Sequence, residues 1–508
     1  MESIMTSGSF ALGLLADTLL ITIGIIFLTI IIVFIADVTQ TKQAIRRNYP
    51  VIGHFRYFFE DLGKFFRQYF FAMDREEMPF NRSRRSWVYQ AAKNVDTTIA
   101  FGSTRNIHEE NAILFVNSPY PSLASDRAAR RMVIGEGFSA HPYDAPSIFN
   151  ISGMSYGALS KPAMLALSHG AKLAHCWLNT GEGGLSPWHL SGGSDLVFQI
   201  GTAKYGCRDA AGNLSDDKLR EIAAHEQVRM FEIKISQGAK PGKGGILPAV
   251  KVTPEIAKIR GIPAGQDSLS PNRHPEIDSV DDLLDMIVHV RKVTGKPVGF
   301  KIVLGESKWI RQLCDRINAR GHADAPDFIT LDSADGGTGA APLSLFDYMG
   351  LPISDTLPML VDVLVDYGLK ERIKVIASGK LVTPGDVAWA ICVGADFITS
   401  ARGFMFSIGC IQALHCNRNT CPTGITTHNK RLQRGLIPEE KAERVANYVN
   451  NMVKELQVIA HSCGVDDVRD LRRNHCRIVQ SNGQSIRLDV YFDALKKSDK
   501  QALVAIED

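Results

Sequence analysis

The sequence predicts an α/β protein in which a (β/α)8 barrel follows one N-terminal transmembrane helix. Two observations support this fold class: an uncharged apolar run near the N-terminus, and short β-branched runs that alternate with helical patterns from about Ser147. Eight such runs separated by helices are typical of a TIM barrel. The eight expected strands are Ile148–Ser152, Cys176–Asn179, Leu196–Ile200, Met230–Ile235, Val298–Val303, Phe328–Leu331, Ile373–Ala377 and Phe397–Thr399.

The apolar run covers Thr18–Ala36, nineteen residues without a charge. At a rise of about 1.5 Å per residue it is just long enough to cross a hydrocarbon core of ~30 Å. A cleavable signal peptide fits less well, because Glu2 and Asp17 precede the run and no small-residue cleavage site follows it. A buried core helix is the remaining alternative. By the positive-inside rule, the rest of the chain is expected in the cytoplasm, since three basic residues follow the run: Lys42, Arg46 and Arg47.

An aromatic stretch comes next, between about Pro50 and Ala72. Its apolar residues recur with the i, i+3, i+4, i+7 spacing that predicts an amphipathic helix. Such a helix after a membrane span either lies in the headgroup region or packs its apolar face on the large domain. The apolar positions are Phe55, Phe58, Phe59, Leu62, Phe65, Phe66, Tyr69 and Phe70.

The chain is expected to have four parts. Residues 1–41 form the transmembrane anchor, 42–139 an amphipathic and polar lead-in, 140–435 the barrel, and 436–508 a helical extension. A Pro- and Gly-rich stretch from about Pro241 to Asp278 is expected to be an insertion over the barrel mouth. The expected helices are Lys161–Leu173, Val280–Val293, Ser354–Tyr367, Thr383–Val393 and Glu439–Cys463.

Composition excludes several classes of function. The net charge is only +3 and no dense basic stripe is present, so the sequence predicts no nucleic-acid binding. Neither a Gly-x-Gly-x-x-Gly between a strand and a helix nor a Walker A motif occurs, so the chain shows no nicotinamide site of its own. No Cys stands first or after a credible propeptide, which excludes an N-terminal-nucleophile glutaminase.

Three cysteines form the sharpest chemical signal. Cys410, Cys416 and Cys421 lie within twelve residues, with Pro422 directly after the last. Soft thiolates close together in a loop can converge on iron, and a following Pro is familiar from iron–sulfur sequences. Three ligands suit a three-iron cluster, or a four-iron cluster with one site open or ligated from elsewhere. Zinc with His415 as fourth ligand is the main alternative, although the spacing is unusual for zinc; three unrelated buried cysteines are the other.

Five glycine-rich segments stand at the ends of expected strands. Such loops let the backbone approach a planar ring or a phosphate, whose oxygens the N–H groups can cradle. In barrels the phosphate usually rests near the ends of the last two strands, here at Gly379-Lys380 and Arg402-Gly403. A single glycine pair would be explained by a turn, but five at one rim indicate a ligand. The segments are Ser152–Gly157, Thr180–Gly184, Gln237–Gly245, Asp335–Gly339 and Ser378–Lys380.

Together these motifs resemble the FMN-binding domain of glutamate synthase, in the same order along the chain. The matching segments are Gly153–Ser160, Asn179–Gly184, Glu232–Gly242, Asp335–Ala340 and the three-cysteine segment, within about Ser147–Thr427. The membrane-anchored arrangement looks like the standalone FMN-binding glutamate synthase family proteins. The resemblance implies an oxidoreductase of EC 1.4 type with FMN and a [3Fe-4S] cluster. In that family, the imine formed from 2-oxoglutarate and ammonia is reduced to L-glutamate.

The resemblance also implies roles for individual residues. Glu182 would be the proton donor or acceptor, with a pKa pulled toward neutrality, and Lys240 and Arg260 would bind substrate carboxylates. Lys301 would stabilise charge at N1/O2 of the reduced flavin. The implied cluster ligands are Cys410, Cys416 and Cys421. The implied cofactor-binding residues are Met154, Ser155, Gln199, Lys234, Lys301, Asp335, Gly336, Gly337, Thr338, Gly339, Ser378, Gly379, Lys380, Arg402 and Gly403.

Three positions depart from the family pattern: Ile246 where glutamate synthases place a Gln that helps bind 2-oxoglutarate, Leu185-Ser186 where they carry Glu-Asp, and Lys380 within the phosphate-side glycines. The expected partners are a 2-oxo acid, ammonia or an amine, and ferredoxin or another electron donor; a homo-oligomer is also expected. A flavin oxidoreductase acting on a different 2-oxo acid or imine is one alternative, and a membrane-tethered electron-transfer module is another. The catalytic domain would be cytoplasmic.

Overall fold

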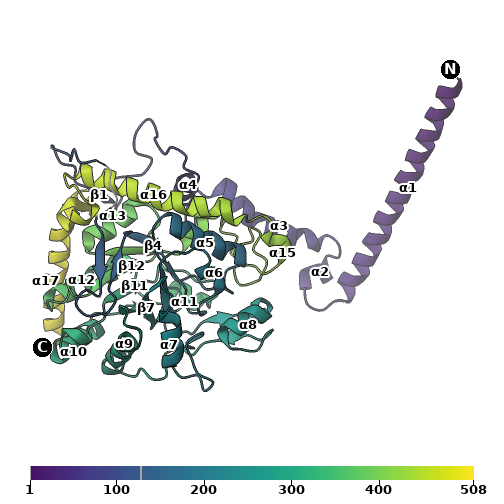
Figure 1. Cartoon of the computed structure of the whole chain (residues 1–508). Coiled ribbons are helices and arrows are strands. Elements are labelled where there is room, and N and C mark those ends of the chain that lie inside the picture. The colour runs from purple at the N-terminus through teal and green to yellow at the C-terminus, as the bar shows by residue number, and fades with distance from the viewer. Residues whose placement is uncertain (1, 126–128, 508) are drawn as a thin grey trace. The chain divides into compact units, whose positions relative to one another are not determined.

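The computed structural model describes residues 2–125 and 129–507. The chain divides into two compact units, residues 1–83 and residues 84–508 (Figure 1).

The first unit begins with a long apolar helix, α1 (Glu2–Thr39). Within it, Leu12–Thr39 is the one stretch among the described residues that is long and apolar enough to cross a membrane. A signal sequence near an N-terminus, or the core helix of a soluble protein, meets the same criteria of length and composition. The predicted apolar run, Thr18–Ala36, lies inside this helix, which extends further in both directions.

The amphipathic helix is present in the first unit as α3 (Gly53–Phe66), and a π-helical turn, η1 (Arg67–Phe71), continues it. A short helix, α2 (Ala44–Asn48), joins it to α1. The phenylalanine side chains of α3 are exposed, among them Phe55, Phe58 and Phe59.

The second unit contains the closed parallel barrel that the sequence predicts. Strand β13 pairs with β4 and closes the ring, with Ile398 opposite Phe149 and Ser400 opposite Ile151. All eight expected strands are confirmed, with ends shifted by at most a few residues. In ring order they are β4 (Phe149–Ile151), β5 (Leu178–Asn179), β6 (Leu196–Ile200), β7 (Val228–Lys234), β10 (Val298–Val303), β11 (Phe328–Asp332), β12 (Lys374–Ser378) and β13 (Phe397–Ser400).

Helices follow the strands and surround the barrel (Figure 1). Local signals set several of their ends: Ser160 Oγ accepts a hydrogen bond from Ala163 N at the start of α5, and Ser279 and Asp282 form a capping box on α9. The helices are α5 (Lys161–Leu173), α6 (Pro187–Leu190), α7 (Asp216–Ala223), α9 (Val280–Thr294), α10 (Lys308–Arg320), α11 (Leu343–Tyr348), α12 (Ile353–Asp366), α13 (Pro384–Val393) and α14 (Arg402–Ser407).

A strand pair covers the amino-terminal end of the barrel. β2 (Met132–Ile134) and β3 (Tyr143–Ala145) are antiparallel, and their apolar side chains join a buried cluster with Trp177, Phe328 and Phe397. These three residues precede or begin barrel strands. The amino end is therefore closed by packing, which leaves the carboxyl end for ligands.

The remaining elements lie before, within and after the barrel sequence. The insertion contains β8 (Ile246–Leu247), η2 (Ala249–Lys251), α8 (Pro254–Arg260) and β9 (Ser268–Leu269). The tail also contains β14 (Cys476–Val479), a strand that the sequence did not predict. It pairs with β1 (Ile113–Phe115), which lies far away in the sequence, so no local pattern indicates the pairing. The others are α4 (Arg82–Ala92), η3 (His322–Asp324), α15 (Lys430–Gln433), α16 (Pro438–Ser462), η4 (Val468–Asp470), η5 (Arg473–His475), β15 (Ser485–Arg487) and α17 (Leu488–Glu507).

Candidate active site

Many of the predicted site residues lie at the carboxyl ends of barrel strands, which share one rim. Gln199 lies in β6, Lys234 ends β7, Lys301 lies in the second half of β10 and Ser378 ends β12. In a barrel of βα units, this rim and the loops after it form the site face. The ring of strands thus brings together residues that are almost two hundred positions apart.

A buried carboxylate, Glu232, lies in β7 beneath this rim, and the sequence analysis did not assign it a role. Its oxygens accept hydrogen bonds from Asn179 Nδ2 (2.8 Å), Gln199 Nε2 (2.6 Å) and Thr330 Oγ1 (2.5 Å). A carboxylate withdrawn from water is costly unless it is hydrogen-bonded, so these three donors stabilise it. In return, Glu232 holds the amide of Gln199. A Glu inside the apolar run of β7 was the signal that could have identified it.

Lys301 forms a buried ion pair with Asp332, which the sequence analysis also missed. Lys301 Nζ lies 3.0 Å from Asp332 Oδ2, and both side chains are less than a tenth exposed. Burial lowers the pKa of Lys301, but Asp332 and Glu232 outweigh it and raise the pKa above its ordinary value. Lys301 therefore keeps its positive charge at the end of β10, as a partner for an anionic ring would require.

Glu182, on the loop after β5, pairs with Lys234 at a distance of 3.0 Å between Oε1 and Nζ. Burial raises the pKa of Glu182, whereas the positive charges of Lys234, Lys240 and Arg260 lower it. The effect of the three cations is larger in sum, so the net shift of the pKa is downward. The expected pull toward neutrality is therefore not found. The three cations at the mouth are the reason, because each favours the ionised carboxylate.

Two glycines make room for the Glu182 side chain. A Cβ at Gly201 would lie 2.6 Å from Glu182 Cβ, and a Cβ at Gly245 would lie 2.5 Å from Glu182 Oε1. Real Cβ atoms do not approach so closely, so a side chain at either position would displace the carboxylate. Gly245 belongs to the insertion and Gly201 follows β6. The carboxylate is thus held in a slot between the rim and the insertion.

Lys240 and Arg260 converge on the same place from the loop after β7 and from α8. Both are almost fully buried. Arg260 Nη1 donates to Ser268 Oγ (3.1 Å), while its Nε has no hydrogen-bond partner among the described residues. Burial lowers the pKa of Lys240 to about 8, against the opposing effect of Glu182. A buried guanidinium donor without a partner indicates a site for an anion.

The insertion is anchored to the loops that follow neighbouring strands. Glu255 in α8 accepts hydrogen bonds from Tyr156 Oη (2.6 Å) and Trp188 Nε1 (3.0 Å). Thr202 Oγ1 donates to Pro271 O (2.7 Å). The insertion therefore lies over the ends of β4 to β6, as predicted, and carries Arg260 to the mouth.

The loop after β4 approaches the rim through its backbone. Met154 N donates to Asn179 O (3.0 Å), and a Cβ at Gly181 would lie 2.8 Å from Ser155 N. His189, which the sequence analysis did not single out, lies 2.9 Å from Met154 O through Nε2. Burial lowers the pKa of His189 to about 4, so the neutral ring donates to this carbonyl. The Met154-Ser155 backbone is therefore fixed on both sides.

The expected phosphate-binding rim has its own close contacts. Gly379 has a φ of 128°, and a Cβ there would lie 2.2 Å from Ser333 Oγ. No atom would lie within 4 Å of a Cβ at Gly339, so the space beside it is open. A cavity of about 1450 Å³ borders Gly379 and Lys380 and continues along α12 and α13. Open space therefore lies beside Gly339 and beside the Gly379-Lys380 segment, where the sequence predicts the phosphate.

Other residues of the expected phosphate site make contacts within the protein. Asp335 Oδ2 accepts a hydrogen bond from Ile353 N (2.9 Å), which caps α12. Arg402 Nη2 donates to Thr338 O (2.6 Å), and a Cβ at Gly337 would lie 3.1 Å from Arg402 Nε. Two further glycines pack tightly, since a Cβ at Gly336 would meet Asp332 Oδ1 at 2.5 Å and one at Gly403 would meet Tyr448 Oη at 2.3 Å.

The three cysteines lie in the irregular segment after α14. Their thiols are free of disulfides, and no three His, Cys, Asp or Glu side chains form a metal-binding group in the described part of the chain. Burial raises the pKa of the Cys410 thiol to about 11, and the charges of Cys416 and Cys421 also raise it, opposed by Arg402. The Cys410 thiol is therefore near enough to Arg402, Cys416 and Cys421 to be influenced by their charges, but the predicted trio of thiols does not converge on a metal-binding group among the described residues.

Two cationic side chains contact this loop. Arg402 Nη1 lies 3.9 Å from Cys416 Sγ. Lys251, which is buried, donates from Nζ to Ala158 O (2.6 Å) and to Cys416 O (3.3 Å). Ala158 belongs to the loop after β4, so Lys251 links the insertion, that loop and the cysteine segment. Lys251 was not predictable from the sequence, because a single Lys in an insertion belongs to no recognisable motif.

Comparison with known proteins places the chain among relatives of glutamate synthase. Residues 108–466 match the family described as "Conserved region in glutamate synthase". The chain is 37% identical to the glutamate synthase large subunit-like protein YerD of Bacillus subtilis (strain 168), over 92% of this chain and 96% of that protein. It is 33% identical to the archaeal-type glutamate synthase (NADPH) of Thermotoga maritima, over 65% of this chain and 62% of that protein.

A similar solved structure is that of mandelate oxidase with (S)-2-phenylpropionate, which is 14% identical and has a TM-score of 0.45. It covers 78% of this chain, and the match extends over 98% of that structure. The family match itself extends over the barrel, the insertion and the cysteine loop. The chain belongs to the FMN-binding glutamate synthase family.

Proposed function

We propose that this flavin oxidoreductase reductively aminates 2-oxoglutarate with external ammonia and so forms L-glutamate. One observation carries the proposal: Glu182, Lys240 and Arg260 converge at the barrel mouth, and the buried Nε of Arg260 has no hydrogen-bond partner within the part of the chain that the structure describes. The two cations can bind the two carboxylates of a dianionic substrate, and the carboxylate of Glu182 is then available for proton transfer.

The substrate carboxylates would bind to Lys240 and Arg260. Both cations are buried, so an ion pair with a carboxylate would be shielded from water and correspondingly strong. Arg260 Nη1 donates its hydrogen bond to Ser268 Oγ, so Nε would be available to donate to the ligand. The insertion would thus bind the substrate and keep water out of the mouth.

The reaction requires a carbon–nitrogen double bond and then two electrons and two protons. Ammonia adds to the keto carbon of 2-oxoglutarate, water leaves, and reduction of the resulting imine gives the amine. Bound FMN would supply the hydride. Glu182, ionised next to Lys234, would accept a proton as ammonia adds and return it as the amine forms.

The residues at the rim fit FMN. Met154, Ser155 and Gln199 would contact the ring, and the protonated Lys301 would face the ring edge that becomes anionic on reduction. The open space at Gly339 and the cavity beside Gly379 and Lys380 suit the phosphate. The other proposed contacts are Lys234, Asp335, Gly336, Gly337, Thr338, Ser378, Arg402 and Gly403.

The thiols of Cys410, Cys416 and Cys421 would hold a [3Fe-4S] cluster. Three soft ligands in one segment, with Arg402 and Lys251 beside them, are suitable for an anionic iron–sulfur group. The cluster would pass single electrons from ferredoxin or another donor protein. Zinc bound by the same thiols is the competing possibility.

A second candidate function is reduction of a different 2-oxo acid or imine. Ile246 occupies the position of a substrate-binding Gln and pairs with Leu269 in the insertion. An apolar side chain there removes a hydrogen bond, and an unsatisfied substrate oxygen costs roughly 1–3 kcal/mol. A membrane-tethered electron-transfer module is a third possibility, in which the mouth has no substrate.

We further propose that α1 anchors the protein as a single-pass membrane protein with the catalytic domain in the cytoplasm. The basic residues after α1 support this orientation. The four-part division at residues 41, 139 and 435, and a homo-oligomeric state, are part of the same proposal.

The decisive experiment is an assay of the purified full chain with reduced ferredoxin, ammonia and 2-oxoglutarate. Glutamate formation that depends on all three supports the proposal. Flavin reduction without glutamate would overturn it, and turnover with another 2-oxo acid would then identify the second candidate. If no 2-oxo acid gives an amino-acid product but electrons still pass from the donor to the flavin, the electron-transfer module is the function that remains.

A further inference from the structure

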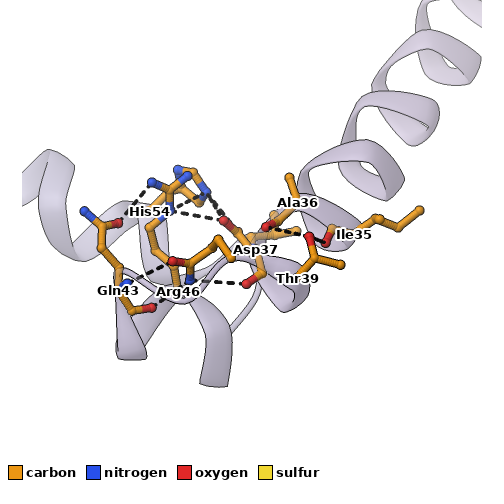
Figure 2. Close-up of polar contacts among 9 residues, drawn as sticks. Ile35, Ala36, Asp37, Thr39, Gln43, Arg46 and His54 are labelled. Atoms are coloured by element: carbon orange, nitrogen blue, oxygen red, sulfur yellow. Dashed lines mark hydrogen bonds and ion pairs between the residues drawn. The ribbon is translucent and has the colours of Figure 1, made fainter.

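The turn after α1 is built around one buried carboxylate, Asp37. Its side chain is 1% exposed and accepts hydrogen bonds from Arg46 Nε (3.1 Å) and from the backbone N–H of Val51 (2.9 Å). His54 Nε2 lies 2.9 Å from Asp37 Oδ2. Figure 2 shows these side chains closing on the carboxylate from α2 and α3. A single group therefore ties the end of α1 to both following helices.

Two backbone features show that the turn has one defined geometry. Val51 has a φ of 67°, which is rare for a β-branched residue and persists only where surrounding contacts impose it. At Gly53 a Cβ would lie 2.9 Å from Arg46 Cα and 3.0 Å from Ile45 O, so only glycine lets α2 and α3 approach each other here. The direction in which α3 leaves α1 is therefore set by the structure of this unit.

The helix that leaves this turn has an exposed aromatic row on one face. The row, defined by Phe55, Phe58, Phe59, Leu62, Phe65, Phe66, Tyr69 and Phe70, follows the i, i+3, i+4, i+7 spacing along α3 and η1. Its aromatic members are each 41–74% exposed. The opposite face carries Glu60, Lys64 and Arg67. Exposed aromatics on so large a part of one helix indicate a surface that contacts an apolar partner.

We propose that α3 and η1 lie in the plane of the membrane that α1 crosses, with the aromatic row facing the acyl chains and the Asp37 cluster fixing the bend between the two helices. The proposal rests on anchoring by α1. The partner is a bilayer with anionic lipid, because residues 40–72 carry six basic and two acidic side chains. Asp37 in the last turn of α1 contacts Val51, just before α3, and His54 at the start of α3, so a spanning α1 places the start of α3 within the headgroup layer.

Brominated acyl chains can test the depth of each face. Three single Trp replacements are made in the full chain: Ile25→Trp in α1, Phe59→Trp in the row, and Lys64→Trp on the opposite face. Each protein is placed in vesicles of phosphatidylcholine and phosphatidylglycerol, with and without dibrominated chains, and its emission is compared with that of the unsubstituted protein. We expect strong quenching for Ile25→Trp and Phe59→Trp, at least twofold more than for Lys64→Trp.

The outcomes separate this proposal from the anchoring on which it rests. No quenching for Ile25→Trp would overturn anchoring itself. Quenching for Ile25→Trp together with equally weak quenching for Phe59→Trp and Lys64→Trp would overturn the in-plane position alone. A blue-shifted but unquenched Phe59→Trp would also overturn it, since the row would then pack against protein.

The role of the Asp37 cluster has its own test. Asp37→Asn keeps the shape of the side chain but removes its charge, which weakens the contacts with Arg46 and His54. Combined with Phe59→Trp, it should reduce quenching at position 59 by at least half, while Ile25→Trp in the same background stays quenched. Unchanged quenching at position 59 would show that the carboxylate does not fix the bend. Gly53→Ala provides a second variant with the same expected direction.

Discussion

The barrel mouth and the cysteine loop are built in different ways. At the mouth, charged side chains pair with one another: Lys234 lies 3.0 Å from Glu182, and Lys301 lies 3.0 Å from Asp332. In the loop, the described thiols form no disulfide and no metal-binding group among themselves. Contacts from outside place the loop, such as the hydrogen bond from Tyr89 Oη to Cys410 O (2.6 Å).

The difference follows from what positions each side chain. A residue on a barrel strand takes its place from the register of the sheet, which many backbone hydrogen bonds fix. A residue in an irregular loop depends on a few side-chain contacts and on whatever the loop binds. Substitutions at the mouth should therefore change chemistry and leave the cofactors bound, whereas substitutions in the loop should remove a cofactor and leave the mouth intact.

Cys421→Ser should have the largest effect, complete loss of the iron–sulfur group with the flavin retained. A serine hydroxyl is a poor ligand for iron compared with a thiolate. Chemical iron and sulfide analysis, an EPR spectrum and the flavin absorbance measure the two cofactors separately. Cys463→Ser is the matched control, because that thiol is similarly buried but lies outside the loop. Unchanged iron in Cys421→Ser, or zinc in place of iron in the unsubstituted protein, would contradict the proposed ligands.

Glu182→Gln should lower glutamate formation by about 10²- to 10⁴-fold, the usual contribution of a positioned acid or base. The amide fits the slot between Gly201 and Gly245 but cannot take a proton. Turnover, flavin absorbance and iron content are compared with those of the unsubstituted protein, and only turnover should change. Normal turnover would exclude Glu182 as the proton carrier.

These predictions mark how far the sequence could reach. Each strand was predictable because its run of β-branched residues is bounded by turn residues, and Val298–Val303 agrees with β10 at both ends. The partners of a site residue were not predictable, because they depend on register. Lys301 lies opposite Thr330, which brings Asp332 within reach at the strand end. Nothing in the local sequence of Lys301 contains that information.

The electrostatics of the site show the same limit. The pKa of Glu182 was expected to be raised toward neutrality. It is lowered instead, because three cations from three separate segments surround the carboxylate. The short strands β14 and β15 were also not predicted, since β14 pairs with a segment more than 350 residues earlier in the chain. Membership of the family and the site motifs were accessible from the sequence because they are local patterns.

Arg260→Met should raise the Kd for 2-oxoglutarate by about 10- to 100-fold. A hydrogen bond to a charged group contributes roughly 1.5–3 kcal/mol, and each 1.4 kcal/mol is about tenfold in affinity. Binding is followed by the change in flavin absorbance on titration. Arg208→Met is the matched control, since Arg208 also lies over the Tyr205 ring, at 5.0 Å compared with 5.2 Å for Arg260, but is more exposed. Equal weakening in both variants would indicate a loss of packing around Tyr205 instead of a lost carboxylate contact.

The smallest expected effect is a pH dependence of substrate affinity that is caused by the titration of Lys240. Because burial lowers its pKa to about 8, the ammonium is present below pH 8 and is lost as the pH rises above it. Affinity for 2-oxoglutarate should therefore fall above about pH 8, by up to about tenfold per pH unit for a single proton. Binding is measured by flavin absorbance in the absence of ammonia, because the titration of ammonia itself would otherwise mask the fall in affinity above pH 8. In Lys240→Arg the fall should disappear, since an arginine stays protonated throughout, and in Lys240→Met binding should be weak and independent of pH. The same fall in all three proteins would assign the titration to another group at the mouth.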